Sequence, residues 1–464
     1  MGTGADVRST EPSVPFVASG SYPVRAGSAV RPLVDGEPAF RRICEAVERA
    51  RHSVWVTVAF LLPDFRMPDD RGSFFDVLDR AVARGLDVRV LFWRVNPETN
   101  RFEPRVFSGS RAQLELLGAR GCAFHARWDR AHGGYCQHQK SWLVDAGQAS
   151  EVAFVGGINL NPRAVVSPGH AGRGHIHDVY AEVAGPAATD VHHNFVQRWN
   201  EASERAAPDG VWGPGGGGGD LPFPTLPSSP AGASLAQIQR TVHAGRYRDG
   251  PPTPGGRPFA IADGERSILE QYLRAIRAAR RSIYIENQAF EVPEVVAELE
   301  LALERGVDAV ILVPSEPENR VRAARRRPDM RAFDDLMRSL GRHERFALVG
   351  IAGRSEGGRH DVYVHAKVML IDDAWATIGS CNLHASSVLG NTELNATFWD
   401  PGVVRALRRE LLAEHLGLDT ADLDDRAALD AYRLIARENR ARRDAGDPEW
   451  QGLAFGLDPA TYGR

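Results

Sequence analysis

Apolar residues recur along the chain with two spacings, one typical of helices and one typical of buried strands. In residues 37–51 and 266–280, apolar positions are separated by three or four residues, which predicts an amphipathic helix in each segment. A short apolar run follows each of these segments, at residues 53–60 and 282–290, and predicts a buried strand. Helix and strand therefore alternate in the same order at two places in the chain, which is typical of an α/β fold.

These two places belong to an internal repeat. The tripeptide Asp-Gly-Glu that begins at Asp35 recurs at Asp263, an offset of 228 residues. In both copies a second helical segment leads to another apolar run, at residues 84–93 and 305–315. The repeat predicts two tandem α/β units, each a mixed, mostly parallel β-sheet flanked by helices.

A segment of different composition separates the two units. Residues 208–257 include the Pro- and Gly-rich stretches PGGGGGD and GPPTPGG, which predict a linker or long loop. We interpret this segment as a spacer, the alternative being a lid over the functional site. The predicted N-terminal unit is then residues 1–207, and the predicted C-terminal unit is residues 258–464.

Composition narrows the class of protein. With 464 residues, of which 43% are hydrophobic and 25% charged, the chain has an ordinary globular composition and enough material for two domains. It contains no apolar run approaching about eighteen residues and no pattern of a secretory signal at its start, so we expect a cytoplasmic protein, with any membrane contact peripheral. The net charge of −4 disfavours nucleic acid as a partner.

The candidate chemistry lies in a motif that occurs once in each unit. The chain has only two lysines, Lys140 and Lys367, and each stands two residues after a histidine and five before an aspartate. Since the 54 other basic residues are arginines, this shared placement of the lysines is not explained by composition. The two H-x-K-x4-D motifs comprise His138, Lys140 and Asp145 in HQKSWLVD, and His365, Lys367 and Asp372 in HAKVMLID.

These residue types suit phosphodiester chemistry. Alternation along a strand would direct each histidine and its lysine to the same face, into one cleft. A Gly-rich turn follows each motif and ends in Asn159 or Asn382, whose amide is a neutral donor for a phosphate oxygen. Charge that develops on phosphate oxygens needs fixed donors, while one histidine can attack phosphorus and another can protonate the leaving alkoxide.

The paired motifs resemble the phospholipase D superfamily, whose members carry two such HKD motifs. The likeness extends from about Val30 to Glu410, and the segments at residues 283–288, 378–383 and 391–396 resemble the lipid-acting branch. The resemblance implies one active site shared by the two units, so that a monomer forms an intramolecular pseudo-dimer and needs no cofactor. The chain departs from the family pattern at its N-terminus, where we find neither the lipid-binding modules of large eukaryotic members nor the membrane helices of typical cardiolipin synthases.

The resemblance also suggests individual roles. His138 is expected to form a phosphohistidine and His365 to act as general acid and base. Asp178 is placed opposite His138, and Glu393 opposite His365, each to hold its imidazole. In the family the motif aspartates, here Asp145 and Asp372, act mainly to hold the fold.

Several functions remain open on the sequence. The leading hypothesis is a phosphodiesterase or phosphatidyltransferase that acts on a phospholipid, with water or an alcohol as acceptor, in lipid degradation or synthesis. The alternatives are a synthase of the cardiolipin type, a nuclease of the same superfamily, and an inactive phosphate-binding descendant. Intact histidines, lysines and asparagines in both units argue against the last.

A cluster of histidines near residue 177 raises a separate question. Two histidines in the HIH sequence, with others nearby, form half of a metal-site pattern. We expect no metal, because no companion carboxylate or cysteine pattern completes a ligand set. The histidines concerned are His170, His175, His177, His192 and His193.

Overall fold

The computed structural model describes residues 14–94, 107, 111–121, 123–131, 134–203, 219–326 and 328–463. Its first half contains a sheet with the strand order β4–β3–β2–β5–β6–β8–β1. The elements are β1 (Arg25–Val34), α1 (Gly36–Arg49), β2 (Ser53–Val58), α2 (Phe74–Ala83), β3 (Asp87–Trp93), α3 (Arg111–Arg120), β4 (His125–Asp129), β5 (Ser141–Val144), β6 (Val152–Gly156), β7 (Ile176–His177), β8 (Val179–Ala184) and α4 (Pro186–Asn200).

The second half repeats this order as β13–β12–β11–β16–β17–β18–β9, with β19 beside β13. Its elements are β9 (Ser234–Val242), β10 (Glu265–Arg266), α5 (Ser267–Ala278), β11 (Ser282–Asn287), α6 (Pro293–Glu304), β12 (Asp308–Leu312), α7 (Asn319–Arg325), α8 (Arg331–Leu340), β13 (Phe346–Ser355), β14 (Gly358–Asp361), β15 (Tyr363–Val364), β16 (Lys367–Ile371), β17 (Trp375–Gly379), α9 (Ala385–Leu389), β18 (Glu393–Trp399), α10 (Pro401–Leu416), α11 (Asp425–Asp444) and β19 (Ala454–Leu457). The predicted duplication and α/β class are confirmed.

The sheets are mixed, but the expectation that most strands are parallel is wrong. In each half the described parallel neighbours are the three strands linked by helices, β2–β3–β4 and β11–β12–β13. The strands within the motifs, β5 and β16, pair antiparallel with the strands that follow them, β6 and β17. Short turns join these strands, and a short turn can connect only antiparallel neighbours.

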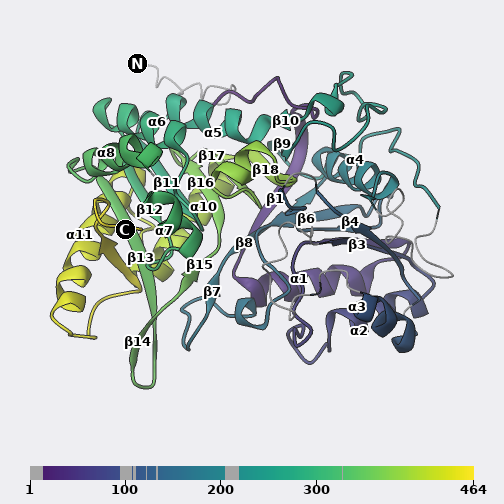
Figure 1. The fold of residues 1–464 in the computed structure, drawn as a ribbon, viewed down its shortest axis with the longest axis horizontal. Helices are drawn as coiled ribbons and strands as arrows, with labels where there is room; N and C mark the ends of the chain where they lie inside the picture. Colours follow the sequence, from purple (N-terminus) through teal and green to yellow (C-terminus); the bar gives the residue numbers. More distant parts are fainter. Residues whose placement is uncertain are drawn as a thin grey trace, which may run out of the picture.

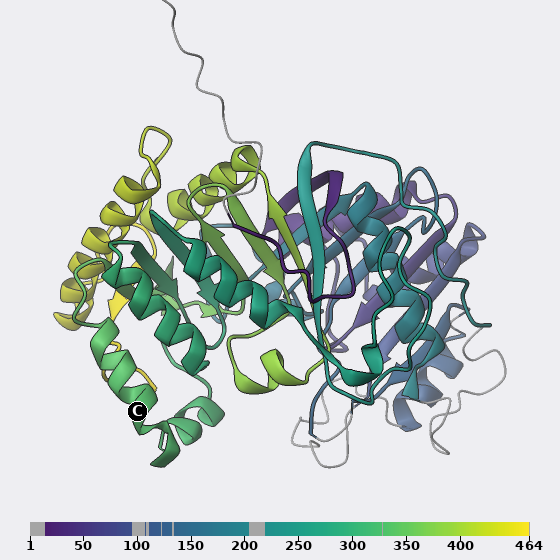
Figure 2. The same ribbon diagram turned by 90° about the horizontal axis from the view of Figure 1, so that it is seen from above.

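One strand of the predicted linker joins the two halves. Within residues 208–257, β9 is almost wholly buried and pairs antiparallel with β18 along its length and with β1 at Arg25 and Ser28. Figures 1 and 2 show β1 and β9 side by side at the junction of the halves. This part of the segment is therefore no spacer. The sequence analysis missed the strand because its apolar alternation is short and lies among prolines and glycines, which dominate the composition of the segment.

Helices cover the sheets on both sides, and three large hydrophobic cores lie among the described residues. One core lies under α1 and α2 in the first half, and another under α5, α6 and α8 in the second. The third contains residues of both halves, including Phe195 of α4 and Leu411 of α10, so the halves share buried apolar surface. Figure 2 shows α11 at the outer end of the second half. Among the residues that the structure describes, every helix is too short or too polar to cross a bilayer.

Candidate active site

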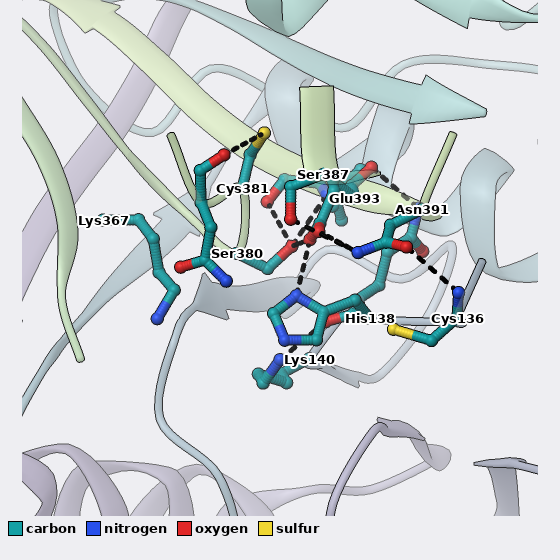
Figure 3. A network of polar contacts seen from close by, with 12 residues as sticks. Cys136, His138, Lys140, Lys367, Ser380, Cys381, Ser387, Asn391 and Glu393 are labelled. Carbon is teal, nitrogen blue, oxygen red and sulfur yellow. Dashed lines mark hydrogen bonds and ion pairs between the residues drawn. The ribbon is translucent and has the colours of Figure 1, made fainter. Parts of the chain in front are cut away.

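The first motif histidine is held by a carboxylate from the second half. His138 is buried three residues before β5, and its Nδ1 lies 2.9 Å from Oε2 of Glu393, the first residue of β18. Figure 3 shows His138 with Glu393 on one side and Lys140 on the other. Because Nδ1 is engaged by the carboxylate, Nε2 is the ring nitrogen that remains for chemistry.

The second motif histidine has the reciprocal arrangement. Nδ1 of His365 lies 2.5 Å from Oδ2 of Asp178, which comes from the first half immediately before β8. The amide of Asn159, also from the first half, lies 3.5 Å from Nε2 of His365. Each imidazole thus depends on both halves of the chain.

The expected pairing of carboxylates is therefore wrong: Glu393 holds His138, and Asp178 holds His365. The backbone explains the exchange. His365 N donates to the carbonyl of His177 at 2.8 Å, in register with the parallel pair β7–β15, which places Asp178 beside His365. His138 N likewise donates to the carbonyl of Thr392 at 3.0 Å, which places Glu393 beside His138.

The two lysines are buried beside the histidines. Nζ of Lys140 donates to the carbonyl of His138 at 2.7 Å, and Nζ of Lys367 donates to the carbonyl of His365. Nζ of Lys367 also lies 3.2 Å from Oε1 of Gln288. No carboxylate contacts either ammonium group directly among the described residues, so both are available to an anion.

Burial lowers the pKa values of both lysines. The pKa of Lys140 falls to about 8, and that of Lys367 falls to about 7, because a buried ammonium loses its hydration. Nearby carboxylates, with Asp178 the largest influence on Lys367, oppose this effect. A phosphate group entering the site would restore the charged forms, as an anion beside an ammonium favours its protonation.

The two histidines also have lowered pKa values, for related reasons. Burial lowers the pKa of His138, although Glu393 partly offsets the effect. Burial together with the charges of Lys367 and Lys140 holds the pKa of His365 well below its usual value. The charge of the lysine in the other motif lowers the pKa of each histidine, which indicates that the two motifs meet in one polar centre.

The pKa values of the two carboxylates are shifted in opposite directions. Burial raises the pKa of Asp178 to about 7, against the opposing charge of Lys367. Burial would also raise the pKa of Glu393, but His138, Lys140 and the hydroxyl of Ser380 outweigh it and hold the pKa below its usual value. Oγ of Ser380 donates to Oε2 of Glu393 at 2.6 Å. In the first repeat Gly157 takes the place of this serine, and a Cβ there would lie 2.3 Å from Oδ1 of Asp178.

Comparison with known proteins indicates the family to which the chain belongs. A family profile described as "Cardiolipin synthase, PLD-like domain" matches residues 272–414. The chain is 24% identical to phospholipase D A of Dictyostelium discoideum over 81% of its own length and 33% of that protein. It is 28% identical to cardiolipin synthase A of Pseudomonas entomophila over 81% of its own length and 66% of that protein. The chain belongs to the phospholipase D superfamily.

The fold agrees with that of a solved structure of similar size. A crystal structure of phosphatidylserine synthase from Haemophilus influenzae matches with a TM-score of 0.53 and 13% identity, covering 90% of this chain and 95% of that one. The alignment thus includes both halves of this phospholipase D superfamily member. The chain spans about a third of the Dictyostelium relative and just under two thirds of the Pseudomonas one.

The sequence analysis missed supporting residues that lie within the segments resembling the superfamily. Ser380 contacts Glu393, and Asn391 joins the same network by donating to Oε1 of Glu393 at 3.5 Å and accepting from the backbone N of Cys136 at 3.0 Å (Figure 3). Gln288 contacts Lys367. The sequence signal that could have indicated these residues is their position in the segments that resemble the superfamily. Except for the contact between Asn391 and Glu393, their partners lie at least 13 residues away or in the other half.

The two asparagines that the sequence predicts to bind phosphate lie in a different part of the fold from the motif aspartates. The side-chain oxygens of Asn159 and Asn382 are buried without a hydrogen-bond partner in the described structure. Oδ1 of Asp145 accepts hydrogen bonds from three successive backbone N–H groups at residues 51–53, and Asp372 does the same at residues 280–282. The aspartates thus hold the turn between helix and strand in each half and lie outside the His–carboxylate pairs.

A second cluster of ionisable side chains lies beside this centre. His170 and His177 meet three buried or nearly buried carboxylates, those of Asp35, Glu286 and Glu414. The premise that no companion carboxylate completes a ligand set is therefore wrong for these two histidines. The partners come from positions 35, 286 and 414, and only the fold brings them together.

Proposed function

We propose that this protein transfers or hydrolyses the phosphatidyl group of a phospholipid through a phosphohistidine intermediate. The observation that carries the proposal is the pair of crossed histidine–carboxylate contacts, at 2.9 and 2.5 Å, flanked by two buried lysines. Such a centre offers one nucleophile, one proton donor and two cations, which a phosphodiester reaction requires. Since one chain supplies both halves, it would act as a monomer.

In the first step, Nε2 of His138 attacks phosphorus and the bond from phosphorus to the headgroup oxygen breaks. His365 gives its proton to the departing alkoxide. In the second step, His365 takes a proton from water or an alcohol, whose oxygen attacks phosphorus and releases His138. Lys140 and Lys367, with the asparagine amides, would stabilise the charge on the non-bridging oxygens.

The different carboxylates support this assignment of roles. A histidine that becomes bonded to phosphorus through Nε2 gains positive charge, and the ionised carboxylate of Glu393 would stabilise it. Because the pKa of Asp178 is raised to about 7, the Asp178–His365 pair retains a proton near neutral pH, as a general acid must. The pair is best regarded as sharing that proton.

A phospholipid substrate is supported by the relatives. Their names include a phospholipase D and a cardiolipin synthase, and the solved neighbour is named a phosphatidylserine synthase. These activities share a phosphatidyl donor and differ in the acceptor. Peripheral contact with a lipid surface would suffice for such a substrate. A nuclease remains the second enzymatic candidate, and the net charge of −4 disfavours it.

The first experiment tests the substrate class. The protein is incubated with mixed phospholipid vesicles and a primary alcohol, with phosphatidylglycerol alone, and with single- and double-stranded DNA. We expect release of headgroup and formation of phosphatidyl alcohol, or of cardiolipin and glycerol, and no DNA cleavage. DNA cleavage without lipid turnover would overturn the lipid assignment.

The second experiment tests the roles of the histidines. His138→Ala and His365→Ala should each abolish turnover, whereas His192→Ala, which removes another buried histidine next to a carboxylate, should not. Rapid denaturation during turnover of a phosphorus-labelled lipid should trap the label on His138. Label on His365 would reverse the two roles, and full activity in both histidine variants would refute the shared site.

A further inference from the structure

The second cluster lies where the two halves meet, next to the active site but separate from it. Asp35 precedes α1, and His170 and His177 come from the loop and short strand before β8. Glu414 lies on α10, in the second half. Asp35 and both histidines are completely buried, and the four side chains can each direct one nitrogen or oxygen atom to a common centre, with all four atoms within 4.8 Å of one another.

The spacing of these atoms matches a four-coordinate metal site. Nε2 of His170 lies 3.2 Å from Oδ2 of Asp35 and 3.3 Å from Oε1 of Glu414. Nδ1 of His177 lies 2.9 Å from Oδ1 of Asp35. Ligands at about 2.0 Å from a tetrahedral ion are about 3.3 Å from one another, and the two separations from Nε2 of His170 match this edge; the contact of His177 is with the other oxygen of Asp35.

Four atoms of the cluster form no hydrogen bond in the described structure. They are Oδ2 of Asp35, both ring nitrogens of His170 and Oε2 of Glu414, although Oδ2 of Asp35 and Nε2 of His170 lie 3.2 Å apart. A buried polar atom without a partner costs about 1–3 kcal/mol, and such atoms are rare in folded proteins. Here Oδ2 of Asp35 and Nε2 of His170 face each other without forming a hydrogen bond, which is the arrangement expected of two ligands of one cation.

The outer contacts also suit a metal site. Nε2 of His177, the nitrogen directed away from the proposed ion, lies 3.1 Å from Oε2 of Glu286. A carboxylate in this position fixes the tautomer of a metal-binding histidine and makes its other nitrogen a stronger ligand. Glu286 is held in turn by the hydroxyl of Tyr284 at 2.7 Å, and the backbone N of Gly169 donates to Oε1 of Glu414 at 2.7 Å.

A neighbouring set of three groups is a weaker candidate. His177, Glu286 and His415 also lie within reach of one ion. This set offers only three ligands and would take His177 Nε2 from its present partner Glu286. Nδ1 of His415 is already 3.0 Å from the hydroxyl of Tyr284. The four-ligand set keeps these contacts intact.

The ligand types indicate the class of ion. Two imidazoles with two carboxylates favour zinc or a similar divalent transition metal over magnesium and calcium, which prefer oxygen ligands alone. Four protein ligands around a buried centre leave no place for a substrate, so the ion would have a structural role.

We propose that Asp35, His170, His177 and Glu414 bind one divalent transition-metal ion of the zinc class that fastens the two halves together beside the active site. The ion would also act on a positioning residue. His177 directly precedes Asp178, and the backbone N of Asp35 donates to the carbonyl of Asp178 at 2.9 Å. Fixing Asp35 and His177 would therefore fix the carboxylate that holds His365.

The test measures metal directly on protein without a polyhistidine tag. The purified protein is depleted with a chelator, titrated with Zn²⁺ or Co²⁺, dialysed and analysed for bound metal. We expect one ion per chain, the intense visible absorption of tetrahedral Co²⁺, and a higher melting temperature on Zn²⁺ addition. Absence of bound metal, or a weak octahedral Co²⁺ spectrum, would overturn the proposal whatever the variants do.

Matched variants locate the ion. His170→Gln and Glu414→Gln should lose stoichiometric binding and the Co²⁺ spectrum, with folding checked by circular dichroism. His192→Gln is the control, because His192 forms a buried contact with Glu151 at 3.0 Å outside the cluster. Glu286→Gln should keep the stoichiometry but weaken Zn²⁺ binding about 10–100-fold. Equal binding by wild type, His170→Gln and Glu414→Gln would place the metal elsewhere and refute the site.

Discussion

At the scale of single residues, the two histidine–carboxylate pairs are similar in geometry but differ in the pKa of the carboxylate. The serine that donates to Glu393 is replaced by a glycine beside Asp178, and only Asp178 has a pKa raised to about 7. One pair is therefore suited to stabilise a positive charge, and the other to deliver a proton. This difference should be visible in how each pair responds to the leaving group.

Asp178→Asn should impair the general acid, and Glu393→Gln should impair the nucleophile. With an ordinary alcohol as leaving group, each variant should lose on the order of 100-fold or more in kcat. With a p-nitrophenyl ester, whose leaving group needs no proton, Asp178→Asn should recover the first step, seen as a rapid burst of p-nitrophenol, while the second step stays slow because His365 must still take a proton from water. Glu393→Gln should not recover. Parallel kinetics on the two substrates provide the measurement, and rescue of Glu393→Gln instead would exchange the proposed roles.

The buried Lys367, which is placed to bind an anion, should lower the free energy of unfolding. Burial lowers its pKa from 10.5 to about 7, so between these pH values the unfolded chain binds more protons and the free energy of unfolding rises with pH. Lys367→Met should therefore be more stable than wild type at pH 7, by on the order of a few kcal/mol, and this advantage should shrink toward pH 10.

Urea unfolding at about pH 7 and about pH 9.5 measures this difference. Lys140→Met is the matched comparison, since the pKa of Lys140 falls only to about 8 and its effect should be smaller. Both variants should be inactive. A stability difference that stays the same at the two pH values would contradict the shifted pKa of Lys367.

At the scale of elements, the motif aspartates connect each motif to its sheet. Oδ1 of Asp145 accepts from the backbone N–H groups of Arg51 and His52 at 2.9 and 2.8 Å, and from Ser53 at 3.3 Å, where α1 gives way to β2. Asp372 holds the turn from α5 to β11 in the same manner. A histidine, a lysine and a structural aspartate thus occur together in the sequence, although only the first two serve the active site.

Asp145→Ala should lower the free energy of unfolding by about 1–3 kcal/mol, because it removes the acceptor of three backbone N–H groups, one of them that of the buried Ser53, while the folded protein keeps most of its activity. Burial alone would raise the pKa of Asp145, but Ser150 and the backbone donors outweigh it and hold the pKa below its usual value. The stabilisation is therefore present above the unfolded pKa of about 4 and is lost as the pH falls through the folded pKa. Thermal unfolding at pH 7 and at acid pH provides the measurement, with Asp372→Ala as the comparison. Complete loss of activity with unchanged stability would contradict the structural role.

At the scale of the whole molecule, contacts between the halves are built into both sheets. The strand β9 pairs with β18 and also reaches β1, while β7 pairs with β15. The N-terminal residues cross to the second half, where the backbone N of Val17 donates to Gln271 at 2.9 Å. The two repeats are therefore halves of one folding unit.

We expect a single cooperative unfolding transition, although a chain of 464 residues would ordinarily unfold domain by domain. Five tryptophans in the described part of the first half, Trp55, Trp93, Trp128, Trp142 and Trp199, make fluorescence weighted toward that half. Fluorescence and far-ultraviolet circular dichroism should give the same midpoint in denaturant. Two separated midpoints would show that the repeats unfold independently.

The sequence by itself determined the local chemistry and the duplication. The spacing of apolar residues predicts α1, β2, α5 and β11, because periodicity depends only on neighbouring positions. The repeated H-x-K-x4-D pattern predicts the histidines and lysines, because residues two apart on a strand share a face. In the structure His138, Lys140 and His365 lie just before β5 and β16, not within them.

Only the tertiary structure decided which residues meet across the molecule. The partner of His138 is Glu393, 255 residues away, and the partner of His365 is Asp178, because β7 and the segment before β18 each pair with the other half. The carboxylates around His177 and the strand within the predicted linker depended on the same long-range pairing. Such contacts leave no periodic signal in one sequence, since they are set by the register of strands from different repeats.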